Sequence, residues 1–154
     1  MNDISIRKAG INDLEDIRRL NNELFELEIN NFDDTLVSGW PYTEEGLDYY
    51  KDLINNYYVY VAIKDDVIVG YLAGSILEYS HIKHKYAELN NMCINNNYRG
   101  LGIGTKLIDQ FKSDMKNNNI TEIRVTASYK NENAKKFYEL KGFYEFETTY
   151  KMDI

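Results

Sequence analysis

The sequence is poor in the residues that build crosslinks and metal sites. It contains one cysteine (Cys93), two histidines (His81 and His84) and one proline among 154 residues. A lone cysteine excludes a disulfide within the chain and a cysteine-rich zinc site, and two histidines add too few ligands for structural zinc. We therefore expect neither a bound metal nor a disulfide framework.

Long apolar runs are missing as well. No apolar run of a signal peptide follows Met1, and no stretch of about 18 apolar residues could span a membrane. These two absences predict a cytoplasmic protein. Hydrophobic residues make up 44% of the chain and charged residues 28%, which is ordinary for a folded protein, and the length suits a single domain over residues 1–154.

Basic residues are outnumbered by acidic ones. The chain has 18 Lys and Arg against 25 Asp and Glu, a net charge of −7, so it is poorly suited to bind nucleic acid or an anionic membrane. Residues 1–60 hold 13 acidic and 5 basic side chains (net −8), whereas residues 61–154 hold 12 and 13 (net +1). We therefore expect a cationic partner at the first part and an anionic partner at the second.

Hydrophobic periodicity predicts a mixture of strands and helices. The expected order is β-α-α-β-β-β-α-β-α-β, with an antiparallel first half and a β-α-β crossover in the second. This order indicates an α+β (mixed α/β) domain with a mostly antiparallel, partly parallel sheet flanked by helices. Strands are expected at 4–6, 57–63, 67–77, 86–94, 120–126 and 143–152, and helices at 12–29, 44–54, 105–117 and 131–141.

The most informative segment is Arg-Gly-Leu-Gly-Ile-Gly-Thr at residues 99–105, which follows a predicted strand and opens a predicted helix. Glycines let a backbone turn tightly and point its N–H groups at an anion, and a helix N-terminus adds about half a positive charge. Arg99 can add a charge-assisted hydrogen bond. The segment predicts a phosphate-binding loop; a glycine-rich turn needed only for close packing is the alternative.

Three phosphate-binding motifs compete for this segment. A Walker loop ends in Gly-Lys-Ser/Thr, whereas the order here is Gly-Thr-Lys. The dinucleotide fingerprint G-x-G-x-x-G fails because the sixth position from Gly100 is Thr105, and the first predicted elements do not form a Rossmann unit. The pattern Arg/Gln-x-x-Gly-x-Gly/Ala is filled by Arg99, Gly102 and Gly104.

A second motif, Asn-Ala-Lys-Lys-Phe-Tyr-Glu-Leu-Lys-Gly-Phe, occupies residues 133–143 on the next predicted helix and its exit. With both motifs in this order, the sequence resembles the GNAT superfamily of N-acetyltransferases. The resemblance covers essentially the whole chain, most strongly residues 87–143 and weakly the part before about residue 56. It implies a GNAT fold and direct transfer of an acetyl group from acetyl-CoA to a primary amine.

The resemblance also implies how acetyl-CoA is held. The glycine-rich loop would bind its pyrophosphate, the end of the preceding strand would pair with the pantetheine arm, and Asn133 would bond near the same arm. An acetyl-cysteine intermediate on Cys93 is not expected, because direct transfer is the rule in the family. The implied cofactor-binding residues are Met92, Cys93, Ile94, Arg99, Gly100, Leu101, Gly102, Ile103, Gly104, Thr105 and Asn133.

Two residues are candidates for catalysis. Tyr138 matches the family's tyrosine near the acetyl-CoA sulfur, where a phenol of pKa about 10 can donate to the departing thiolate; packing of its helix is the alternative. Glu88 matches a position where some members place a catalytic base, with bound water or a merely solvated glutamate as alternatives. Strand alternation places Glu88 and Asn90 on one face. Leu89 and Asn91 then lie on the other face, unless a bulge changes the alternation.

The acceptor site in this family is walled by the first helices and their loop, which here form the acidic part of the chain. Such a wall suits a cationic amine, with surface solubility as the alternative role of the acids. A polyamine, an aminoglycoside, a lysine side chain and a peptide N-terminus all qualify. A non-catalytic acyl-CoA-binding or sensing domain, a longer acyl donor and a homodimer stay open. The candidate wall residues are Glu23, Glu26, Glu28, Asp33 and Asp34, with Phe25, Phe32, Trp40 and Tyr42.

Overall fold

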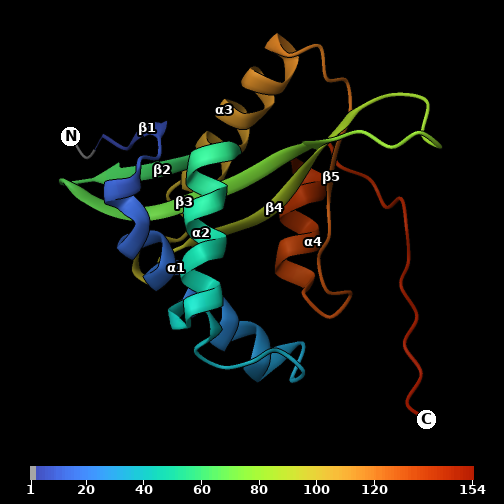
Figure 1. Cartoon of the computed structure of the whole chain (residues 1–154), viewed down its shortest axis with the longest axis horizontal. Coiled ribbons are helices and arrows are strands. Elements are labelled where there is room, and N and C mark those ends of the chain that lie inside the picture. Colours follow the sequence, from blue (N-terminus) through green and yellow to red (C-terminus); the bar gives the residue numbers. More distant parts are fainter. Residues whose placement is uncertain (1–2) are drawn as a thin grey trace.

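The computed structural model describes residues 3–154 and builds one five-stranded sheet in the order β1-β2-β3-β4-β5 (Figure 1). Neighbouring strands from β1 to β4 pair antiparallel, whereas β4 and β5 pair parallel across α3. The predicted antiparallel half and parallel crossover are confirmed. The strands are β1 Ser5–Lys8, β2 Tyr58–Lys64, β3 Val67–Leu77, β4 Tyr86–Ile94 and β5 Ile123–Val125.

Four α-helices flank the sheet within residues 3–154, at the places where the periodicity predicts them. Helices α1 and α2 pack against one face, and α3 covers the other. In α3, Leu107, Phe111 and Met115 follow one another at intervals of four residues and are all buried, which is the pattern of a helix with one apolar face. The helices are α1 Leu14–Asn31, α2 Glu44–Asn56, α3 Ile103–Asn117 and α4 Glu132–Leu140.

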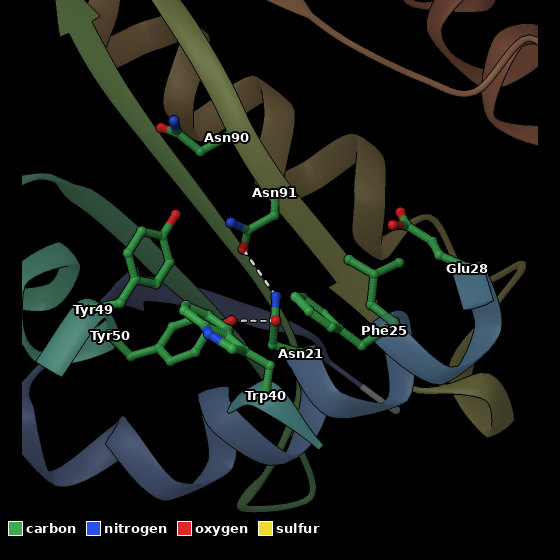
Figure 2. A pocket seen from close by; sticks show the side chains of 9 residues that line it. Asn21, Phe25, Glu28, Trp40, Tyr49, Tyr50, Asn90 and Asn91 are labelled. Atoms are coloured by element: carbon green, nitrogen blue, oxygen red, sulfur yellow. Dashed lines mark hydrogen bonds between the residues drawn. The ribbon is translucent and has the colours of Figure 1, made fainter. Parts of the chain in front are cut away.

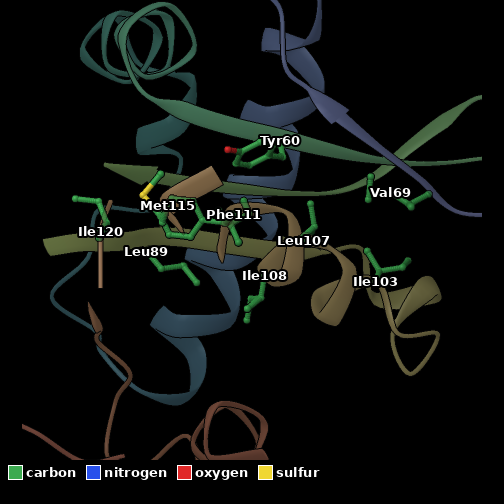
Figure 3. Close-up of a cluster of buried hydrophobic side chains, with 12 residues drawn as sticks. Tyr60, Val69, Leu89, Ile103, Leu107, Ile108, Phe111, Met115 and Ile120 are labelled. Atoms are coloured by element: carbon green, nitrogen blue, oxygen red, sulfur yellow. The ribbon is translucent and has the colours of Figure 1, made fainter. Parts of the chain in front are cut away.

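The core on the α3 face is almost wholly apolar (Figure 3). Phe111 lies at its centre with no exposed surface, and the ring of Tyr60 packs 6.4 Å from it. Gly74 of β3 makes this packing possible, because a Cβ atom there would overlap the Phe111 ring. Phe137 and Tyr138 of α4 pack against the edge of the same core.

Strand β4 contains a bulge. Ala73 pairs with Asn91 and Gly74 pairs with Leu89, so Asn90 is the extra residue. Leu89 therefore faces the α3 core while Asn91 faces α1 and α2, where it accepts a hydrogen bond from the Tyr71 hydroxyl. Plain alternation would place Leu89 and Asn91 on one face. The bulge, the exception named above, shifts the alternation by one residue and separates them.

The strand expected at residues 143–152 does not form in the described chain. Residues 143–154 leave α4 and run away from the sheet without pairing to it (Figure 1). Strand β5 is also shorter than expected, with three residues in place of 120–126. Both differences have the same cause, because a strand needs a ladder of hydrogen bonds to a neighbouring strand. Within residues 3–154, β5 pairs with β4 on one side only, and no strand pairs with its other side.

Candidate functional site

The loop between β4 and α3 takes its shape from two glycines. Gly100 and Gly102 each have φ of +78°, a conformation that side-chain-bearing residues rarely adopt. Gly102 is the N-cap of α3 and offers no side chain to its first turn. Within residues 3–154 no side chain bonds the N–H groups at 103–105, so they are directed at the loop together with the helix dipole. This geometry suits an anion, as the sequence predicts.

The third glycine of the loop has a different role. A Cβ atom at Gly104 would lie 3.0 Å from the Phe137 ring, so this glycine lets the start of α3 approach α4. The packing alternative thus holds for Gly104, whereas the conformational requirement holds for the other two. Arg99 is exposed beside the loop and donates a 3.3 Å hydrogen bond from Nε to the Ile94 carbonyl.

Strands β4 and β5 separate just before the loop. They pair only between Ala87–Leu89 and Ile123–Val125. Met92, Cys93 and Ile94 pair with β3, and within residues 3–154 no strand pairs with them on the other side. Their outward backbone groups are therefore free for an extended ligand, and pairing of this edge with pantetheine stays a prediction.

A pocket lies on the α1 and α2 face of β4, next to the bulge (Figure 2). Its volume is about 290 Å³. Three aromatic rings form its wall: Phe25 stacks on Trp40 at 5.8 Å between centroids, and Tyr49 meets Trp40 edge-on at 5.6 Å. The lining residues are Asn21, Leu24, Phe25, Glu28, Trp40, Tyr49, Tyr50, Asn90 and Asn91.

A buried hydrogen-bond network supports the pocket floor. The Tyr50 hydroxyl donates to the Asn21 side-chain oxygen, and the Asn21 amide donates to the Tyr71 hydroxyl. The Tyr71 hydroxyl in turn donates to Asn91. Burial raises the pKa of Tyr71 well above its ordinary value, so it remains a neutral donor. The network fixes α1, α2, β3 and β4 to one another beneath the pocket.

Glu28 is the one acidic residue that lines the pocket. Burial raises the pKa of this carboxyl group, and the nearby charge of Asp33 raises it further. Other acids predicted for the acceptor wall have local partners. Glu23 accepts hydrogen bonds from Asn95 at 3.2 and 3.3 Å, and Glu26 accepts one from Ser38 at 2.6 Å. Of the nine wall candidates, the pocket lining includes Phe25, Glu28 and Trp40.

Tyr138 of α4 packs against the α3-face core, next to Phe137, which lies against Gly104 of the loop. Its ring packs edge-on against Phe137 and Phe143, each at 5.5 Å between centroids. Burial raises the pKa of Tyr138 to about 12, and the charge of Glu28 adds to the effect. The phenol is therefore protonated near neutral pH and lies within electrostatic range of the pocket carboxylate.

Three further predicted site residues are Glu88, Asn133 and Cys93. Glu88 is absent from the pocket lining. Its charge acts on the lining residue Tyr49, whose pKa is raised chiefly by burial and further by the Glu88 charge. Asn133 is exposed in the first turn of α4, whose N-cap is Asn131. Burial raises the pKa of the Cys93 thiol to about 12, which makes it a poor nucleophile.

Sequence reasoning missed the polar part of the pocket. Asn21, Asn91 and two tyrosines of α2, Tyr49 and Tyr50, were not among the candidates. One signal was present: Asn21 interrupts the apolar face of α1 between Ile17 and Leu24, and a buried amide requires partners. Across residues 3–154 we find no group of three side chains arranged to hold a metal. The same residues include no helix with the length and apolarity to cross a membrane.

Comparison with known proteins adds two findings. The family model for the acetyltransferase (GNAT) family matches residues 14–143. The fold is similar to that of a tetramutant of the BH1408 protein of Bacillus halodurans, with a TM-score of 0.89, 20% identity, and coverage of 97% of this chain and 99% of that chain.

Two further structures with bound cofactor are similar. The aminoglycoside N-acetyltransferase AAC(6')-Iy in complex with CoA has a TM-score of 0.78 at 19% identity, covering 100% of this chain and 96% of that one. A predicted acetyltransferase of Clostridium acetobutylicum with acetyl-CoA has a TM-score of 0.79 at 18% identity, covering 98% and 96%. At these identities the likeness establishes the fold.

Proposed function

Because the chain belongs to the acetyltransferase (GNAT) family, we propose that it moves the acetyl group of acetyl-CoA to a primary amine of a small cationic molecule by direct attack. The observation that carries this proposal is the position of Tyr138. Its helix packs against the start of α3 through Phe137 and Gly104, and its phenol is within electrostatic range of Glu28, the one carboxylate of the aromatic pocket.

The donor half rests on the loop and the diverging strand. Free N–H groups at the start of α3, with Arg99 beside them, suit the pyrophosphate of acetyl-CoA. The unpaired side of Met92–Ile94 suits the amide-bearing pantetheine arm. Asn133 lies at the start of α4, the helix that also contains Tyr138. The CoA and acetyl-CoA complexes of two structural neighbours support this assignment.

The acceptor half rests on the pocket. Phe25, Trp40 and Tyr49 supply aromatic rings, whose faces attract a cation, and Glu28 supplies the opposite charge. A volume of about 290 Å³ lies near the lower end of ligand sites, so the pocket suits one amine-bearing end of a molecule. The neighbour AAC(6')-Iy was solved with an analogue that joins CoA to an acetylated aminoglycoside fragment, which is consistent with a cationic acceptor.

The reaction then needs three proton movements. The ammonium group gives a proton to Glu88 or to a bound water, and the neutral nitrogen attacks the thioester carbonyl. The carbon–nitrogen bond forms and the carbon–sulfur bond breaks, and the Tyr138 hydroxyl donates its proton to the leaving thiolate. The nitrogen, positively charged after the attack, releases its second proton to give the neutral amide, and this proton returns through solvent to the Tyr138 oxygen. A pKa of about 12 keeps this hydroxyl protonated at neutral pH. Because Glu88 does not line the pocket, a water molecule would relay the proton between Glu88 and the amine.

Calorimetry with acetyl-CoA and a thiol-release assay over a panel of amines test the proposal. We expect micromolar to sub-millimolar binding of acetyl-CoA, weakened about tenfold by Arg99→Ala and unchanged by Lys112→Ala, an exposed position on α3 far from the loop. Absence of CoA binding would overturn the assignment. Tight binding without turnover on any amine would favour a sensing domain, and turnover on peptides alone would favour a protein acetyltransferase.

A further inference from the structure

Asn95 lies at the point where β4 ends and the chain enters the glycine-rich loop. It follows Ile94, the last residue of β4, and its backbone N–H donates a 2.8 Å hydrogen bond to the Val69 carbonyl of β3. Its side-chain oxygen accepts a 3.0 Å hydrogen bond from the Asn97 N–H and so caps the 3₁₀ turn Asn96–Tyr98. The backbone and the side-chain oxygen of Asn95 therefore set the direction in which the chain enters the loop.

The amide nitrogen of the same side chain contacts a different element. Asn95 Nδ2 donates to both carboxylate oxygens of Glu23 on α1, at 3.2 and 3.3 Å. The cap needs only the side-chain oxygen, which an aspartate or a serine supplies as well as an asparagine does. The nitrogen therefore makes a second, separate contact, between residues 72 positions apart in the sequence. This contact joins α1 to the entrance of the glycine-rich loop.

The Glu23 carboxylate is itself held by a neighbour on α1. Arg19, one turn earlier, donates a 3.4 Å hydrogen bond to Glu23 Oε1. Arg19 also donates to the Asp16 carboxylate at 3.2 Å and to the Ile68 carbonyl of β3 at 3.3 Å. A carboxylate in such a network is more restricted than one in a single exposed ion pair. Glu23 is thus anchored to the sheet through Arg19 and can orient Asn95.

A carboxylate at this position is unexpected beside a loop that suits an anion. The pKa of the Cys93 thiol is raised chiefly by burial, and the charges of Glu23 and Arg99 act on it in opposite directions. Both charges therefore lie near the same end of β4. A negative charge there weakens the binding of an anion unless nearby donors engage it. Asn95 and Arg19 both direct donors at Glu23, which leaves the carboxylate to serve as an acceptor.

The helix that holds Asn95 also lines the acceptor pocket. Glu23 lies on α1 among the residues that α1 contributes to the pocket lining, and it reaches the loop instead of the pocket. One helix therefore contacts both the pocket and the entrance of the loop. The lining residues from α1 are Asn21, Leu24, Phe25 and Glu28.

We propose that Asn95 is a positioning residue for the glycine-rich loop and that Glu23 holds it in place from α1. This inference rests on the proposed function, in which the loop binds the pyrophosphate of acetyl-CoA. With the contact intact, the N–H groups of the loop are arranged before the ligand arrives, which lowers the entropic cost of binding. The helix that lines the acceptor pocket thereby also sets the position of the donor loop.

An exchange of donor and acceptor across the contact tests this proposal. Asn95→Asp keeps the capping oxygen but sets two carboxylates against each other, and it should raise the Kd for acetyl-CoA about tenfold. The kcat at saturating acetyl-CoA and the melting temperature should stay nearly unchanged. Adding Glu23→Gln returns an N–H donor from the other side and should bring the Kd back to within about threefold of the unaltered protein. Calorimetry, steady-state kinetics and thermal unfolding provide these quantities.

The matched control separates the hydrogen bond from net charge. Asn95→Asp with Glu26→Gln has the same net charge as the double variant of the contact, and Glu26 lies on the same helix but binds Ser38. This control should keep the raised Kd. Equal restoration by Glu26→Gln would show that charge alone acts on the ligand, and it would overturn the proposal.

The remaining outcomes distinguish this proposal from the proposed function. If the unaltered protein binds no acetyl-CoA, the proposed function fails and this inference fails with it. If the unaltered protein binds acetyl-CoA and Asn95→Asp binds it equally well, this inference alone fails. Circular dichroism shows whether each variant is folded. Should Asn95→Asp not fold, Glu23→Ala removes the same two hydrogen bonds from the α1 side, and an unchanged Kd in that variant would overturn the proposal.

Discussion

The two faces of the sheet bury side chains of different chemistry. Under α3, the core around Phe111 is apolar, and Tyr60 reaches out of it to hydrogen-bond Asp114. Under α1 and α2, apolar residues share the space with an amide–phenol network of Asn21, Tyr50 and Tyr71. The first face stabilises the fold chiefly by burial of apolar side chains, whereas the second also holds polar groups in fixed positions beside a pocket. We infer that stability and substrate recognition are divided between the faces.

The largest effect should come from the α3 face. Phe111→Ala removes a side chain with no exposed surface from the centre of that core and should lower the free energy of unfolding by about 3–5 kcal/mol. Phe25→Ala, on the pocket face, is the matched control and should cost about 1–2 kcal/mol because its ring is only partly buried. Urea denaturation measures both. Equal losses would contradict the division between the faces.

A second prediction concerns Tyr138, the proton donor of the proposed reaction. Tyr138→Phe should lower kcat about 100-fold, because the proton donor is lost while the ring still packs against Phe137 and Phe143. Acetyl-CoA affinity should stay nearly unchanged. Tyr129→Phe, at a tyrosine that is 75% exposed, should alter neither quantity. Steady-state kinetics and calorimetry provide the two numbers, and an unchanged kcat would reduce Tyr138 to a packing role.

The third prediction has the smallest effect and concerns the acceptor pocket. Glu28→Gln should raise KM for the amine about tenfold, because it removes the one carboxylate in the lining. The neighbouring Glu26→Gln, whose side chain binds Ser38 outside the pocket, should leave KM unchanged. An equal change in both variants would show that the general acidity of α1, and not the pocket, attracts the amine.

The same substitution has a pH-dependent signature in stability. Burial raises the pKa of Glu28 above its ordinary 4.5, so the folded state holds this proton to higher pH than the unfolded state does. The contribution of Glu28 to stability therefore falls as pH rises through this interval. Thermal unfolding should show Glu28→Gln to be more stable than the unaltered protein at pH 7. The difference should diminish below about pH 4.

Much of the fold could be predicted from the sequence because its elements are locally determined. The spacing of Leu107, Phe111 and Met115 specifies α3, and Gly142 marks the end of α4. The glycine-rich loop could be located for the same reason, since Gly100 and Gly102 adopt a conformation that few other residues tolerate. The segment at 143–152 was different. Its alternation predicts a strand, but whether a strand forms depends on a partner edge that alternation does not specify.

The pocket was predicted less well, and the cause is tertiary. The acidic composition of residues 1–60 suggested several acceptor carboxylates, yet hydrogen bonds to Asn95 and Ser38 engage Glu23 and Glu26 outside the pocket. The aromatic wall unites Phe25 of α1 with Tyr49 of α2, and no local pattern indicates that these rings meet. The bulge at Asn90 likewise arises from pairing between β3 and β4.

Gly74 affects both the glycine-rich loop and the pocket, although it belongs to neither. Because it has no side chain, the Phe111 ring rests directly on β3 beside the β4 bulge, and this contact sets how closely α3 approaches the sheet. The glycine-rich loop lies at the start of the same helix, and the bulge in β4 contributes to the pocket lining. A methyl group added at Gly74 would therefore push α3 away from the sheet, and with it would change the separation between the glycine-rich loop and the pocket.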